Sequence, residues 1–301
     1  DYGHSVVETS DGGLVVTGNT DYFGNSYQVY LLKTDSNGDL LWEKNFGGTS
    51  IDYGHSVVET SDGGLVVTGY TESFGNCWQV YLLKTDSTGN LLWEKNFGGT
   101  GGDVGYSVVE TSDGGLVVTG FTDCFGNGNQ VYLLKTDSNG DLLWEKNFGG
   151  TRNDSGHSVV ETSDGGLVVT GDTYSFGNRS QVYLLKTDSK GNMLWEKGHG
   201  TSRGNSGSSV VETSDGGLVV TGHTISFENN NQVYLLKTDS TGNLLWEKNF
   251  GGTRDDSGES VVETSDGGLV VTGYMTSFGI STQVYMIWTD SEGNGISEPG
   301  W

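Results

Sequence analysis

The sequence has little proline, little cysteine, few basic residues and no long apolar run. The single proline agrees with uninterrupted β-ladders, because proline cannot donate to a ladder. No apolar run approaches the ~18 residues of a membrane span, and no charged-then-apolar leader opens the chain, so we do not expect membrane insertion. Fifteen basic residues against 39 acidic ones give a net charge of −24, which repels phosphate backbones and argues against nucleic acid as a partner.

The acidity predicts a well-solvated surface and does not identify a ligand.

The two cysteines, Cys77 and Cys124, fall in loops of neighbouring repeats and could form a disulfide only if their Cα atoms came within about 7 Å. A chain of 301 residues buries roughly 75% of its unfolded surface, so it needs neither a disulfide nor a metal to fold. We therefore expect a monomer without a cofactor.

A stretch of fourteen residues, SVVETSDGGLVVTG, begins at Ser5 and recurs every 51 residues, six times in all. Each copy predicts two short strands joined by Asp-Gly-Gly, the turn chemistry of a tight antiparallel hairpin. An internal period of this length predicts units that stack on one another to bury a core. We expect a single domain, 1–301, with units at 1–51, 52–102, 103–153, 154–204, 205–255 and 256–301.

Each unit carries four strand signals, which are rich in Val, Tyr, Leu and Trp and are separated by Gly, Asn and Asp. In the first unit they are the sequences GHSVVET, LVVTG, QVYLLKTD (Gln28–Asp35) and LLWEKNF (Leu40–Phe46). Four short antiparallel strands per unit, six times over, predict a six-bladed β-propeller of class all-β. A β-solenoid is the alternative, but Asp-Gly hairpins favour antiparallel pairing. The tryptophans of the fourth strand, such as Trp42, are predicted to be packing residues at the wider rim.

The sixth unit departs from the pattern. Trp288 stands where the other units have a lysine, and NGISEPGW replaces the fourth strand. We expect an incomplete last blade, which Ile296–Trp301 caps imperfectly. The abrupt start of the chain suggests a domain taken from a longer protein, with any export signal outside it.

The stretch LLWEKNFGGTSIDYGHSVVETSDGGLVVTGYT resembles the bacterial and archaeal β-propeller repeat called SBBP, which is found in secreted and cell-surface proteins. This resemblance covers essentially the whole chain. It implies the propeller fold and an extracellular or cell-surface location, and it brings no catalytic residues. Separately, TDSNGDLLW resembles the turn and rim strand of quinoprotein-type blades, which concerns blade geometry and does not imply a quinone.

The copies differ mainly in two places: between the second and third strands of each unit, and where one unit connects to the next. In a four-stranded meander both connections emerge on one face of the blade, which we name the variable face. Either these loops bind a ligand on a rigid scaffold, or longer loops drift freely while short turns are fixed by their dihedral angles.

Chemistry favours binding at this face, because aromatic, amide, carboxylate and histidine side chains suit an uncharged polar ligand such as a sugar. The candidates at the entry of the first strand are His4, His55, Tyr106, His157, Ser208 and Glu259. The candidates just outside them are Asn19, Tyr70, Phe121, Asp172, His223 and Tyr274, and the set extends outward to Tyr22, Tyr27, Trp78 and Tyr174.

Catalytic and metal chemistries fit less well. Propeller symmetry spreads equivalent histidines too far apart for one zinc ion. The run Asp35-Ser-Asn-Gly-Asp39 has its glycine misplaced for a calcium loop, and the copy-specific acids show no acid and base pair of the glycosidase kind. Glutamates that occur in all six units (Glu8 and its equivalents) are predicted to be structural.

We therefore expect a non-catalytic binding or adhesion module, with a glycan as the first ligand class and a protein ligand next. The alternative is a structural or protein-interaction propeller whose loops have merely drifted.

Overall fold

The computed structural model describes residues 1–21, 26–75, 77–124, 128–225, 230–277 and 281–295. The chain is all-β and forms a six-bladed β-propeller, as predicted: five sheets have four strands and the last has three. Neighbouring strands within each sheet pair antiparallel, which excludes the solenoid. The contacts divide the chain into two compact units, Asp1–Thr151 and Arg152–Trp301, while the single domain stays a prediction.

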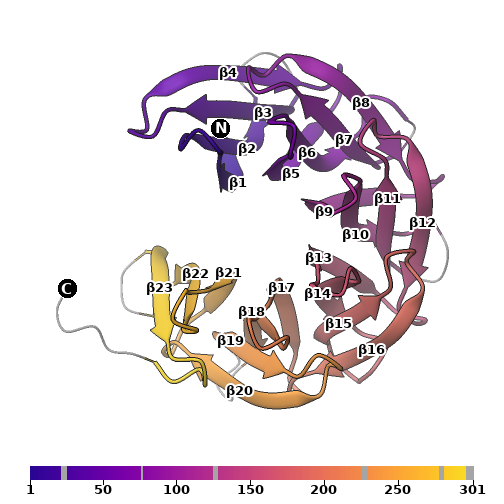
Figure 1. Ribbon diagram of the computed structural model, residues 1–301. Helices are drawn as coiled ribbons and strands as arrows, with labels where there is room; N and C mark the ends of the chain where they lie inside the picture. The colour runs from indigo at the N-terminus through magenta and orange to yellow at the C-terminus, as the bar shows by residue number, and fades with distance from the viewer. Residues whose placement is uncertain (22–25, 76, 125–127, 226–229, 278–280, 296–301) are drawn as a thin grey trace. The chain divides into compact units, whose positions relative to one another are not determined.

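The first unit contains three four-stranded blades (Figure 1). The first blade consists of β1 (Tyr2–Glu8), β2 (Leu14–Thr20), β3 (Gln28–Thr34) and β4 (Leu40–Phe46). The second consists of β5 (Asp52–Glu59), β6 (Leu65–Thr71), β7 (Gln79–Thr85) and β8 (Leu91–Phe97). The third consists of β9 (Asp103–Glu110), β10 (Leu116–Thr122), β11 (Gln130–Thr136) and β12 (Leu142–Phe148).

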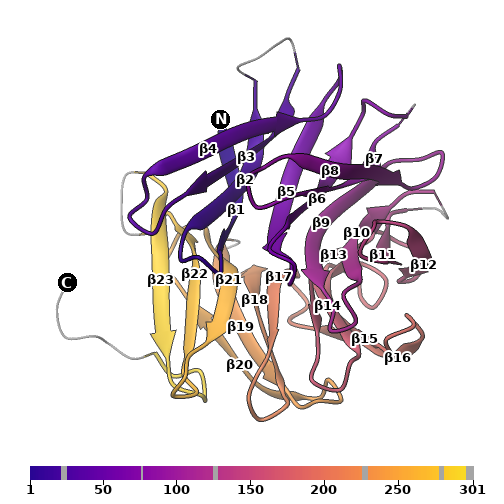
Figure 2. The same cartoon turned by 45° about the horizontal axis from the view of Figure 1, so that its top comes forward.

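The second unit contains two four-stranded blades and the three-stranded one. The fourth blade consists of β13 (Asp154–Glu161), β14 (Leu167–Thr173), β15 (Gln181–Thr187) and β16 (Met193–His199). The fifth consists of β17 (Asn205–Glu212), β18 (Leu218–Ile225), β19 (Asn231–Thr238) and β20 (Leu244–Phe250). The sixth consists of β21 (Asp256–Glu263), β22 (Leu269–Met275) and β23 (Gln283–Thr289), which run side by side in Figure 2.

Consecutive blades pack face to face through one repeated apolar interface. Between the first two blades, Val15, Val29 and Leu31 meet a face of the second blade that includes Val57 and Leu65, all of them buried. The same pattern recurs between the second and third, the fourth and fifth, and the fifth and sixth blades. The burial of these residues is the main stabilising contribution of each interface.

Contacts between the turns and strands of neighbouring blades reinforce this packing. The carboxylate of Glu59 accepts hydrogen bonds from the backbone nitrogen and the hydroxyl of Ser10 in the preceding blade, at 2.7 and 3.0 Å. Trp42 packs on the apolar cluster and covers the turn at Gly89 of the following blade. The repeated glutamate and tryptophan therefore have structural contacts, in keeping with their repetition.

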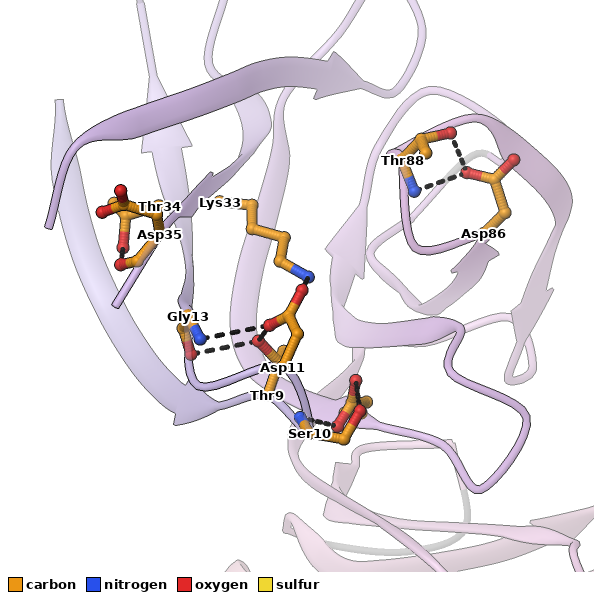
Figure 3. Close-up of polar contacts among 10 residues, drawn as sticks. Thr9, Ser10, Asp11, Gly13, Lys33, Thr34, Asp35, Asp86 and Thr88 are labelled. Carbon is orange, nitrogen blue, oxygen red and sulfur yellow. Dashed lines mark hydrogen bonds and ion pairs between the residues drawn. The ribbon is translucent and has the colours of Figure 1, made fainter. Parts of the chain in front are cut away.

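A lysine on the third strand neutralises the aspartate of the hairpin turn within each of the first five blades. In the first blade the amino group of Lys33 lies 2.6 Å from the carboxylate of Asp11, which also accepts from Thr9 and from the Gly13 nitrogen (Figure 3). The lysine side chain is buried and the aspartate is exposed. This hydrogen bonding with Lys33 and Thr9 holds the pKa of Asp11 well below its usual range.

The sixth blade lacks this pair, because Trp288 replaces the lysine opposite Asp266. Among the described residues, β23 pairs with β22 on one side, and beyond it only Thr289 and Gly295 form a bridge. The last blade thus has three strands, as its sequence predicts. The predicted capping segment, Ile296–Trp301, lies outside the described residues.

Candidate functional site

The first strand of every blade carries a β-bulge at a position that differs between the copies. In the second blade Gly54 pairs with Gly69 and Ser56 with Thr68, which leaves His55 without a cross-strand partner. Bulges redirect a side chain and are common beside functional sites. The bulged residues are the six that the sequence predicts at the strand entry: His4, His55, Tyr106, His157, Ser208 and Glu259.

The second predicted set belongs to strands and not to loops. The second strand of each blade runs past the glycine at which it is predicted to end, so that Tyr70 on β6 pairs with Tyr53 on β5. The end of this strand pair is fixed by the buried carboxylate of Asp52, which accepts hydrogen bonds from the hydroxyls of Thr71 and Ser73. This correction makes the candidates more rigid: Asn19, Tyr70, Phe121, Asp172, His223 and Tyr274 are all held by ladder pairing.

The loops of the variable face contact each other, as the meander predicts. The backbone nitrogen of Ser50, in the connection between the first two blades, donates to the hydroxyl of Ser73 at 3.0 Å. The Gln28 amide donates to the carbonyl oxygen of Gly48 in the same connection, at 3.2 Å. The two kinds of variable loop therefore lie at the same end of the blade.

Successive ring contacts join eight side chains of the first unit at this end. We name them the aromatic cluster: His4, Tyr27, Tyr53, His55, Tyr70, Trp78, Tyr106 and Phe121. Tyr70 is central, because its ring stacks on Tyr53 with centroids 5.0 Å apart and lies 5.8 Å from His55 and 5.5 Å from Trp78. The indole of Trp78 is 46% exposed and donates to the Glu72 carboxylate, so one rim of the cluster faces solvent.

The cluster continues along the bulged positions. His55 stacks on Tyr106 at 5.2 Å, and Tyr106 lies 5.9 Å from Phe121. On the other side His55 meets the edge of His4, whose Nε2 lies 2.8 Å from Oδ1 of Asn19. Aromatic faces thus lie next to polar groups, the combination expected for a ligand with both CH and hydroxyl groups.

Tyr70 and His55, at the middle of the cluster, are neutral near pH 7. Burial, with smaller contributions from Tyr53 and Glu72, raises the pKa of Tyr70 to about 12, so its hydroxyl stays protonated. Burial lowers the pKa of His55 to about 4, so its ring stays uncharged. A neutral ligand that binds here therefore does not have to desolvate a charge on either ring.

The corresponding positions of the second unit are polar and titratable. Nε2 of His157 lies 3.2 Å from Oδ1 of Asp172, and its Nδ1 lies 3.0 Å from the carbonyl oxygen of Gly207. Burial raises the pKa of Asp172, against the opposing effect of His157, and burial lowers the pKa of His223. Oxygen atoms therefore face both nitrogens of His157.

A further hollow of the variable face, of about 380 Å³, lies in the second unit between the fifth and sixth blades. Its lining is polar and consists of Asn230, Arg254, Asp255, Thr276, Ser281 and Thr282. No sequence signal points to this hollow, because its residues come from loops that differ in every copy.

The structure gathers part of the predicted set and leaves the rest apart. His4, His55, Tyr70, Trp78, Tyr106 and Phe121 form one cluster with Tyr27, while Tyr174 is exposed in the second unit and Tyr22 lies outside the described residues. Sequence reasoning missed Tyr53 as a site residue. Its signal was the copy-specific tyrosine two positions before the bulge, which faces Tyr70 across the ladder.

Both cysteines are free: Cys77 donates to the carbonyl oxygen of Thr100, and Cys124 accepts from the Gly101 nitrogen. Within the described part of the chain, no three His, Cys, Asp or Glu side chains gather as metal ligands would. The same residues include no helix that is long and apolar enough to cross a membrane.

Comparison with protein families gives one model, described as outer membrane protein assembly factor BamB, which matches residues 3–189 and 79–287. These two overlapping matches together cover most of the chain. The match agrees with the resemblance to quinoprotein-type blades, whereas the SBBP resemblance stays a prediction.

A curated relative is the regulatory protein FlaEY of Caulobacter vibrioides, which is 29% identical over 199 residues. The match covers 56% of this chain and 20% of that protein, so this chain corresponds to a small part of its relative.

Solved structures share the fold at low identity. A protein of unknown function from Dyadobacter fermentans has a TM-score of 0.61 at 14% identity, with 95% of this chain and 93% of that chain covered. An α-L-arabinofuranosidase from Fusarium graminearum has a TM-score of 0.57 at 12% identity, with 95% and 92% covered. At this identity the likeness concerns the fold alone.

Proposed function

Because this chain belongs to the family described as outer membrane protein assembly factor BamB, we propose that it is a non-catalytic binding module of an exported or cell-surface protein. Its ligand binds at the variable face of the first unit, and carbohydrate is the ligand class. The observation that carries this proposal is the aromatic cluster, in which Tyr70 joins the half-exposed Trp78 to the bulged His55.

The chemistry of the cluster supports a neutral sugar. Flat rings cover the CH faces of a pyranose, while the Glu72 carboxylate and the tyrosine hydroxyls offer hydrogen bonds to its hydroxyl groups. The net charge of −24 opposes anionic ligands, which favours a neutral glycan over a phosphorylated or sulfated one.

The experiment is a glycan-array screen of the purified protein. The double variant Tyr70→Ala, Phe121→Ala removes two rings of the cluster, and Leu92→Ala removes an apolar side chain that is 57% exposed on β8 of the same unit. A signal that the double variant loses and Leu92→Ala keeps supports the proposal. Equal signals from all three proteins place the ligand elsewhere.

A second candidate is a protein-interaction platform, which the description of the family as an assembly factor favours. The absence of any binding signal from the wild-type protein on the glycan array would favour this candidate. A glycoside hydrolase would instead show turnover that disappears in Asp172→Asn or Glu259→Gln variants.

A further inference from the structure

Trp78 lies at the edge of the aromatic cluster between two carboxylates, those of Glu72 and Asp123. Its indole nitrogen donates to Glu72, and its ring lies 5.5 Å from the ring of Tyr70. At another edge of the indole, a Cβ at Gly102 would lie 3.7 Å from Cε3 of Trp78 and 3.5 Å from Oδ2 of Asp123. Because glycine has no side chain, the space between this ring and the second carboxylate stays open.

Hydrogen bonds with the backbone fix the ring and the second carboxylate on the same connection of the first unit. The Gly102 nitrogen donates to Oδ1 of Asp123, and the Asp123 nitrogen donates back to the Gly102 carbonyl oxygen at 3.0 Å. The carbonyl oxygen of Trp78 accepts from the Asp103 nitrogen at 2.9 Å. The Asp123 carboxylate and the indole are therefore held in place before any ligand binds, which favours affinity.

The variable loops of the first unit contain acidic residues and no basic ones. Their segments 19–27, 47–55, 70–78, 98–106 and 121–129 have neither lysine nor arginine, while Asp21, Glu72 and Asp123 occupy equivalent positions in the three blades. All four arginines of the chain lie in the corresponding loops of the second unit, at Arg152, Arg179, Arg203 and Arg254.

The negative charge beside the rings is not balanced by a basic side chain. Among the described residues, neither Glu72 nor Asp123 forms an ion pair with a lysine or arginine. The charge of Glu72 also acts on the cluster, because it adds to the effects of burial and of Tyr53 that raise the pKa of Tyr70 to about 12. A cation is the ligand that such a site attracts.

We propose that the Trp78 edge of the aromatic cluster binds an ammonium group, so that the glycan of this site carries a free amine, as an amino sugar does. A cation is attracted to the face of an indole within about 6 Å of the ring centre, and carboxylates form strong hydrogen bonds with its N–H groups. A hydroxyl group gains less here, because it does not compensate the negative charges. This inference deepens the proposed function and rests on it for the sugar.

Two oligosaccharides of equal length test the amine. One is an oligomer of glucosamine, which carries ammonium groups, and the other is the same oligomer with every amine acetylated, which is neutral. Calorimetry measures the affinity of each for the wild-type protein. We expect the glucosamine oligomer to bind at least about fivefold more tightly at low salt, and this preference to shrink as salt is raised.

The double variant Glu72→Gln, Asp123→Asn removes both charges and keeps the shapes of the side chains. Its matched control is Asp39→Asn, Asp141→Asn, which removes two charges from other turns of the first unit, where the second blade has Asn90. Loss of the preference in the first variant and its retention in the control support the proposal. A preference that persists in Glu72→Gln, Asp123→Asn overturns it.

The ammonium site and the glycan proposal fail in different ways. Equal binding of both oligomers that is lost in Tyr70→Ala, Phe121→Ala overturns the ammonium site and leaves the glycan proposal standing. Methylammonium chloride tests the ammonium site without a sugar, with sodium chloride as the reference and the NMR signal of the Trp78 indole N–H, assigned with Trp78→Phe, as the readout. A shift that Glu72→Gln, Asp123→Asn loses supports the site even where no glycan binds, and the absence of a shift overturns it.

Discussion

Nδ1 of His55 lies 3.1 Å from the carbonyl oxygen of Gly105, in the following blade. A carbonyl oxygen only accepts, so this nitrogen carries the ring proton. Burial, with a smaller effect from His4, lowers the pKa of His55 to about 4. Near pH 7 this contact between blades is therefore made by a neutral imidazole, because its burial disfavours the charged form.

We expect the free energy of unfolding to fall as the pH drops from about 6.5 to about 4. The unfolded chain protonates this histidine near 6.5 and the folded chain near 4, so the unfolded state binds the proton first. The contribution of His55 is complete above pH 6.5, and about 2 to 3 kcal/mol is lost across this window. Urea unfolding at several pH values measures the slope.

His55→Tyr is the matched control, because tyrosine is the natural residue at this position in the third blade. The variant should remove the share of the pH dependence that His55 causes. Identical slopes for the two proteins would contradict the account.

The hairpin turn of the second blade tests the ion pair between Lys84 and Asp62. Asp62→Ala leaves the amino group of Lys84 buried without its carboxylate and should cost about 1 to 2 kcal/mol, since Asp62 itself is 60% exposed. Asp266→Ala removes the equivalent aspartate where no lysine stands opposite and should cost less. Chemical unfolding of both variants gives the difference, and equal losses would exclude a contribution of the ion pair.

A buried amide weakens the fifth blade. Oδ1 of Asn205 and the hydroxyl of Thr224 are both buried without a hydrogen-bond partner among the described residues, whereas Asp154 of the fourth blade accepts from Thr173. Asn205→Asp loses the hydrogen bond from Nδ2 of Asn205 to the carbonyl oxygen of Thr201, but it should give the Thr224 hydroxyl the carboxylate acceptor that Thr173 has and stabilise the protein by about 1 kcal/mol at pH 7. The reciprocal variant Asp154→Asn should destabilise it. Thermal unfolding measures both, and a loss of stability in Asn205→Asp would show that the fifth blade tolerates no charge there.

Two turn glycines separate backbone strain from contact between blades. Gly38 and Gly89 have φ angles of 86° and 78°, so alanine is strained at either position. A Cβ at Gly89 would approach the ring of Trp42 at 2.9 Å, and a Cβ at Gly38 meets nothing within 4 Å. Gly89→Ala should therefore cost more than the ~1 kcal/mol expected of Gly38→Ala. Equal losses in chemical unfolding would mean that Trp42 moves away freely.

Much of the fold could be predicted because the same pattern of strands and turns occurs in six copies. The hairpin turn fixes antiparallel pairing, and Leu40–Phe46 appears as a strand with the predicted bounds. The end of the second strand was predicted too early, because the polar pair of Thr71 with the buried Asp52 gives no local strand signal.

The candidate site could be predicted in composition but not in geometry. Comparison of the copies identifies His55 and Tyr70 as positions that differ from copy to copy. The ring contacts between them depend on the bulge at His55, however, and no residue type in the strand predicts this bulge. The partner of Tyr70, Tyr53, follows only from the register of the ladder.

Glycan binding by the aromatic cluster is tested most directly by a calorimetric titration of the strongest neutral glycan from the array into the wild-type protein and the Tyr70→Ala, Phe121→Ala variant. We expect binding to weaken by at least about fivefold in the variant, because each of the two lost aromatic contacts contributes roughly 0.5 to 1.5 kcal/mol. Unchanged affinity in a folded variant would contradict the assignment of the ligand to the aromatic cluster.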